Sequence, residues 1–180
     1  MKHNSKIGAL ILALALFVSV FVGCGGNSGT ASGSADSGSQ AAADTVKGET
    51  VTWGNITALV PEGMTYTGGS VIDKKDPDVL NIAKKDNATN YFLITVNDDL
   101  DEAKDGVTAT KEANDGAKDT TFEAGVKWTG VTYDFSGMAV NHVYAQVGDK
   151  VVVIQSYGFA PDDDTTKAVL GSIKISEKDD

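Results

Sequence analysis

The sequence contains no arginine, and histidine, cysteine and proline are also scarce, with two, one and three residues among 180. Arginine is the side chain best suited to bind phosphate through two parallel hydrogen bonds. The formal net charge of the chain is −10 at pH 7. An acidic chain without arginine repels a phosphate backbone, so we expect no nucleic-acid partner. A single thiol also excludes an intramolecular disulfide.

The scarcity of histidine limits the catalytic and metal chemistry. Beyond His3, the sequence contains only His142, so a metal site with two imidazole ligands is excluded there and a catalytic imidazole would have to be His142. Residues 49–177 contain neither Gly-x-Ser-x-Gly nor Ser-x-x-Lys, the two common signatures of serine acyl transfer. We therefore expect a protein that is not an enzyme and has no resident cofactor. The alternative is a hydrolase or metal-assisted enzyme that uses His142 and nearby carboxylates.

The only cysteine, Cys24, lies directly after an uncharged N-terminal segment. Lys2 and Lys6 precede residues 7–23, which carry no charge. The run Phe21-Val22-Gly23-Cys24 resembles the bacterial lipoprotein signal, with Phe at a position that usually holds Leu. This resemblance implies cleavage between Gly23 and Cys24 and attachment of acyl chains such as palmitate to the Cys24 sulfur.

A lipidated cysteine would place the protein at the cell membrane, on its extracytoplasmic face. Two acyl chains hold a protein stably, whereas one holds it only marginally. Two alternatives remain for the same segment: a signal peptide cut elsewhere, or an uncleaved transmembrane helix. The segment 7–23 is 17 residues long, which is at the lower limit for a helix that spans a bilayer, and no basic cluster follows it.

The composition divides the rest of the chain into a linker, one domain and a short acidic tail. Residues 24–48 begin with the cysteine and continue with Gly, Ser and Ala, which cannot bury a core and favour a flexible coil. Residues 49–177 are long enough for one domain, and residues 178–180 are acidic. We expect the domain to be held near the bilayer by the acylated cysteine alone, because its negative charge repels anionic lipids.

Periodicity within the domain predicts strands that alternate with two helices. Asp99 and Glu102 resemble a capping box, so we expect a helix with a thin apolar stripe after Asp99. A second helix is expected after the acidic run 162–164. Gly148-Asp149 has the composition of a type II′ hairpin turn. The predicted strands are residues 55–60, 79–83, 91–96, 126–135, 139–147 and 150–157.

These elements predict an α+β fold in which helices pack on an antiparallel sheet. Their order, with a Val-Pro-Glu-Gly turn after the first strand, a middle helix, a long hairpin and a closing helix that ends in Leu170-Gly171-Ser172-Ile173-Lys174-Ile175, resembles the PsbP-like superfamily. That resemblance implies an α/β/α sandwich and a role in binding or assembly.

The hairpin and the middle helix contain the candidate ligand residues. Pairing outward from the turn places His142, Tyr144, Gln155 and Tyr157 on the second, polar and aromatic face of the hairpin. We expect a half-exposed His142 there. Trp53, Trp128 and Tyr133 are mainly core candidates that could otherwise stack on a sugar or a peptide. A partial calcium-loop pattern covers Asp101, Asp105 and Glu112, and a solvated helix explains the same residues.

The sequence thus predicts a surface lipoprotein with a non-enzymatic domain. Its expected partners are the bilayer, through Cys24, and an envelope protein, glycan or ion that the residues do not identify.

Overall fold

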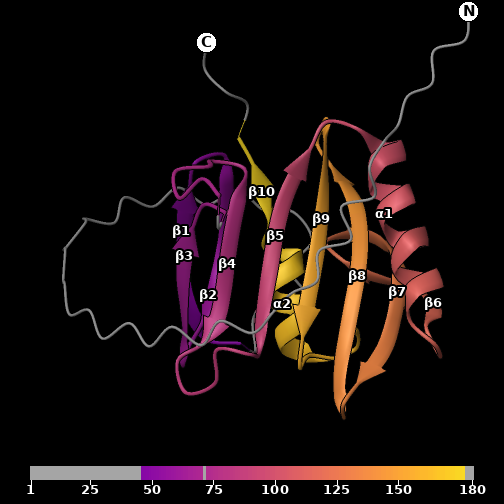
Figure 1. The fold of residues 1–180 in the computed structure, drawn as a ribbon. Coiled ribbons are helices and arrows are strands. Elements are labelled where there is room, and N and C mark those ends of the chain that lie inside the picture. The colour runs from indigo at the N-terminus through magenta and orange to yellow at the C-terminus, as the bar shows by residue number, and fades with distance from the viewer. Residues whose placement is uncertain (1–45, 71, 177–180) are drawn as a thin grey trace, which may run out of the picture. The chain divides into compact units, whose positions relative to one another are not determined.

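The computed structural model describes residues 46–70 and 72–176, which form ten strands and two helices (Figure 1). The signal segment, Cys24, most of the linker and the acidic tail lie outside these described residues. The elements are β1 (Gly48–Trp53), β2 (Ile56–Pro61), β3 (Met64–Gly68), β4 (Val79–Lys84), β5 (Tyr91–Asn97), α1 (Leu100–Ala113), β6 (Lys118–Ala124), β7 (Val126–Phe135), β8 (Met138–Val147), β9 (Lys150–Tyr157), α2 (Asp164–Gly171) and β10 (Lys174–Ile175).

The strands form two antiparallel sheets. The larger has seven strands in the order β3-β4-β5-β9-β8-β7-β6, and the smaller has three in the order β1-β2-β10. The α+β class predicted from the sequence is therefore confirmed, although sheets dominate the domain. The expected hairpin is also present, with Gly148 at φ 66° in the turn and Val143 paired with Ile154.

The main core lies between the large sheet on one side and the small sheet with α2 on the other. Trp128 is fully buried there, and its indole N–H donates to the Ala124 carbonyl at 3.0 Å. Two cross-strand pairs of the β8–β9 hairpin, Ala145 with Val152 and Val143 with Ile154, are also buried in this core. Other fully buried side chains of this core are Ile56, Leu80, Ile82, Phe92, Ile94 and Val169.

Helix α1 packs on the opposite face of the large sheet, over β7, β8 and β9 (Figure 1). The Asp99 carboxylate caps it by accepting from the backbone N–H groups of Asp101 and Glu102 at 2.8 and 3.3 Å, as the sequence predicted. Only Ala103 and Val107 of the helix are buried. This second apolar layer is therefore thin.

Four strands, β1, β3, β6 and β10, were not predicted from the sequence. Strand β6 (Lys118–Ala124) is rich in polar and charged residues, forms an edge of the sheet and is mostly exposed. Strand β3 is a short edge strand whose only apolar aliphatic residue is Met64, and β1 begins at Gly48, at the end of the expected linker. Edge strands lack the apolar pattern that identifies central ones.

The strand predicted at residues 91–96 is present as β5, and its two faces differ in burial. β5 is central, between β4 and β9. Phe92 and Ile94 are fully buried in the core, but Leu93 and Thr95 on the other side are only half-buried. This difference exists because α1 packs on β7, β8 and β9.

Candidate functional site

His142 lies beneath α1 and is 8% exposed, so the expected half-exposed histidine is a buried one. Its Nδ1 atom lies 2.6 Å from the Thr110 hydroxyl oxygen. Gly106 faces the ring: a Cβ atom at this position would be 3.6 Å from His142 Cε1, an ordinary van der Waals distance, so the helix lies directly against the imidazole. Burial lowers the pKa of His142 below its ordinary value. The neutral ring is therefore a packing element of the α1 interface.

Helix α1 covers part of the ligand surface predicted from the sequence and leaves the rest partly exposed. Tyr144 packs against the small cluster of Ala103, Val151 and Val153 under α1. Gln155 and Tyr157, which occupy the same face further along β9, are half-buried. The four candidates share one face of the hairpin, and His142 pairs directly with Gln155, but His142 is buried whereas Gln155 and Tyr157 are half-buried.

Tyr157 belongs to a group of three tyrosines from three strands. Its ring stacks on that of Tyr91, with centroids 4.9 Å apart and an interplanar angle of 26°. Burial and hydrogen bonding with the Tyr157 hydroxyl raise the pKa of Tyr133 to about 12 and also raise the pKa of Tyr91. The Tyr91 and Tyr133 phenols are therefore neutral hydrogen-bonding groups at physiological pH.

The calcium candidates Asp101, Asp105 and Glu112 all lie on α1 and are exposed. A rise of about 1.5 Å per residue separates positions 101 and 112 by about 16 Å along the helix axis, which is too far for one ion. Asp101 instead forms an ion pair with Lys104 at 2.9 Å. Across residues 46–70 and 72–176, no group of three or more His, Cys, Asp or Glu side chains is placed to hold a metal ion.

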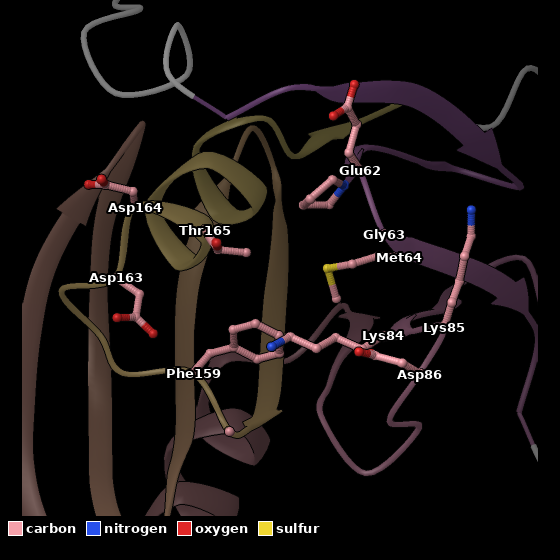
Figure 2. Close-up of a pocket in the computed structure, with 12 residues that line it drawn as sticks. Glu62, Gly63, Met64, Lys84, Lys85, Asp86, Phe159, Asp163, Asp164 and Thr165 are labelled. Atoms are coloured by element: carbon pink, nitrogen blue, oxygen red, sulfur yellow. The ribbon is translucent and has the colours of Figure 1, made fainter.

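A pocket of about 700 Å³ opens at the end of the core (Figure 2). Three separate segments form it: the β2–β3 turn, the end of β4 with the loop that follows, and the β9–α2 connection. Its lining residues are Pro61, Glu62, Gly63, Met64, Lys84, Lys85, Asp86, Gly158, Phe159, Asp163, Asp164 and Thr165.

The floor of this pocket is apolar and rigidly supported. Met64 and Phe159 are both buried, and Phe159 stacks on Phe92 with ring centroids 4.4 Å apart. The Phe159 carbonyl accepts a 2.7 Å hydrogen bond from the side-chain amide of Asn141, which is itself fully buried. The Asp163 carboxylate stabilises the β9–α2 connection by accepting a hydrogen bond from the Ala160 N–H at 2.8 Å.

The pocket rim is charged, with more acidic than basic groups. The carboxylates come from Glu62, Asp86, Asp163 and Asp164, and the ammonium groups from Lys84 and Lys85. Figure 2 shows the Lys84 side chain extended towards Phe159, and its Nζ atom is 5.4 Å from the ring centroid. Such an arrangement suits binding of a group with apolar and polar parts.

No motif in the sequence predicts this pocket. Its two floor residues, Met64 and Phe159, are isolated apolar residues next to glycines, Gly63 and Gly158, and only this local composition could have pointed to them. Trp53 and Trp128 are accounted for by packing, because Trp128 is core and Trp53 covers Gly68 and donates to the Asp76 carbonyl at 2.9 Å.

In the described part of the chain, neither helix has the length and apolarity needed to cross a bilayer. No family model matches the sequence, and no curated protein matches it. The chain is similar in structure to a crystal structure from Bacteroides thetaiotaomicron VPI-5482, with 12% sequence identity and a TM-score of 0.47. The match covers 74% of this chain and 50% of the other, so this chain spans about half the length of that protein.

Proposed function

We propose that this chain is a bacterial lipoprotein whose folded domain is anchored to the extracytoplasmic face of the cell membrane and binds an envelope partner. The observation that carries the proposal is Cys24, the only cysteine of the chain, which directly follows an uncharged segment and Gly23. The Gly- and Ser-rich residues that follow would separate the anchor from the domain, since they offer little apolar surface for a core.

The position of His142 supports binding over catalysis. A general base must reach the proton that it removes, within about 3 Å or through one water. His142 is buried under α1 and directs its Nδ1 atom at Thr110, whereas the pocket is lined by other residues. An enzyme that depends on this imidazole would first have to displace the helix.

We further propose that the domain is related to the PsbP-like superfamily. The element order supports this proposal: a middle helix between β5 and β6, the long β7–β8–β9 meander and the closing helix α2 occur in the expected sequence. An experimental structure of the domain superposed on members of that superfamily would test it. We expect the sheet order and both helices to match, and a different strand order would refute the relationship.

Lipidation is tested by growing cells that express the tagged full-length chain with radiolabelled palmitate. We expect the wild-type protein to be labelled and to sediment with membranes, and the Cys24→Ser variant to lose the label and leave the membrane fraction. Ser28→Ala, a change just after the cysteine, is the matched control and should retain the label. A wild-type chain that carries no acyl group, or a Cys24→Ser variant that remains membrane-bound, would overturn the proposed anchor.

A further inference from the structure

We propose that the surface formed by Asn81, Ala83, Tyr91, Leu93, Gln155 and Tyr157 binds a neutral glycan, with a sugar ring placed against the free side of the Tyr91 ring. We call this surface the tyrosine face. It lies on β4, β5 and β9, on the side of the large sheet that faces away from the main core. The inference rests on the proposed extracytoplasmic location and names the ligand class of the binding domain.

The strand register brings these residues together. Tyr91 is paired with Ala83 of β4 on one side and with Tyr157 of β9 on the other. Leu93 is paired with Asn81 and with Gln155 on the same two strands. Because residues two apart on a strand share a face, the six side chains form two adjacent rows across three strands.

The tyrosine face carries no charge on a strongly acidic chain. All six of its residues are uncharged, and so are Thr65 and Thr67, which continue the two rows onto β3. The chain as a whole has a formal net charge of −10. Ionic ligands would find no partner here, whereas a neutral ligand with many hydroxyl groups matches the face in charge and hydrogen-bonding character.

The stacking geometry leaves one aromatic surface available. Neighbouring strands are about 4.8 Å apart, and the Tyr91 and Tyr157 centroids are 4.9 Å apart in a stacked arrangement. The ring faces therefore point from strand to strand. One side of Tyr91 is covered by Tyr157, and the other is directed towards β4, where the partner residue is the small Ala83. An aromatic face beside a small residue can accept the apolar side of a sugar ring.

Hydrogen-bonding groups surround this position. The tyrosine hydroxyls and the Gln155 amide can both donate and accept. The Asn81 Oδ1 atom is buried and has no hydrogen-bond partner among the described residues.

Helix α1 occupies a different part of this sheet side. It packs on β7, β8 and β9, and Figure 1 shows β3 and β4 at the opposite end of the sheet from β7. The residues of the tyrosine face are half-buried, and Thr65 and Thr67 are exposed. The face thus continues to an open strand edge, which permits an extended chain of sugar units to lie across it.

The test is affinity electrophoresis of the full mature chain, purified in a detergent without a sugar headgroup. The gels contain a neutral polysaccharide, namely glycol chitin, mannan, dextran or hydroxyethylcellulose, or the anionic polygalacturonate. We expect retardation in at least one neutral gel and none in the anionic gel. Tyr91→Ala should weaken the apparent affinity at least tenfold, and Ala83→Trp, which fills the space beside the ring, should do the same.

The matched control is Tyr66→Ala, on the neighbouring strand β3, where the 40% exposed side chain lies on the other face of the sheet. It should bind like the wild type, and circular dichroism should show that every variant is folded. The inference is overturned if no neutral gel retards the protein, if only polygalacturonate does, or if both face variants bind normally. The inference would also be overturned if a photo-crosslinker at position 93 captured another protein and not the added glycan. None of these outcomes affects palmitate labelling of Cys24, so the two proposals fail separately.

Discussion

Asn141 should be one of the most sensitive polar positions of the domain, because it joins the large sheet to the floor of the pocket. It is 1% exposed, and its side-chain amide donates to the Ser156 hydroxyl at 2.8 Å and to the Phe159 carbonyl at 2.7 Å. Asn141→Leu keeps a similar volume and removes both bonds. Because Leu leaves no large cavity, the loss of stability in this variant reports the contribution of the hydrogen bonds.

The expected cost follows from what each lost bond leaves behind. The Phe159 carbonyl becomes a buried acceptor without a donor, which costs about 1–3 kcal/mol, and loss of the Ser156 bond costs about 1 kcal/mol because that hydroxyl can rotate. We expect the free energy of unfolding to fall by about 2–4 kcal/mol in total. For a domain of this size, the melting temperature should fall by about 6–15 °C.

Thermal and urea unfolding followed by circular dichroism measure this change. Ser156→Ala is the control, because it retains the bond to Phe159 and should cost only about 1 kcal/mol. Hydrogen exchange adds a local measurement: amides of residues 158–163 should exchange faster in Asn141→Leu, whereas those of the β8–β9 turn should not change. The reasoning is refuted if Asn141→Leu unfolds within about 1 kcal/mol of the wild type or if Ser156→Ala is the more destabilised variant.

Two further predictions concern α1. Because burial holds the pKa of His142 below the ordinary value of 6.5, the unfolded chain binds this proton more readily than the folded one. The stabilising contribution of the neutral ring is complete above pH 6.5 and is lost as the pH falls below it. Urea unfolding between pH 7.5 and 5.5 should therefore show a steeper loss of stability for the wild type than for His142→Gln, and parallel curves would contradict this. Asp99→Ala removes the helix cap and should cost about 1 kcal/mol, whereas Asp105→Ala, an exposed change in the same helix, should cost less; equal costs in thermal unfolding would contradict the capping role.

The sequence predicted well the features that depend on neighbours in the chain. The turn at Gly148 and the pairing on both sides of it were predicted correctly, because a two-residue loop determines the register of the strands that it joins. The cap at Asp99 was predicted correctly for the same reason, since the acceptor and donors lie within three residues. Apolar central strands were identified because their burial leaves a strong pattern in the sequence.

Features that depend on distant partners were not predicted. His142 looks half-exposed on an isolated hairpin, and it is buried only because Gly106 and Thr110 of α1 pack over it. The pocket is likewise assembled from residues around Met64, Lys84 and Phe159, which are far apart in the sequence. No local sequence pattern predicts contacts between residues that are so far apart in the chain.

The sequence by itself determined the acidic charge, the lack of arginine, the single thiol and the existence of strands and two helices, because each follows from composition or from short-range periodicity. Only the tertiary structure decided which side chains meet. The order of the seven-stranded sheet aligned Tyr91 with Tyr157 and Ala83, and the placement of α1 buried His142 while its strand partner Gln155 stayed half-buried. The physical reason is that packing of whole elements, and not the spacing of residues along the chain, decides which side chains are covered.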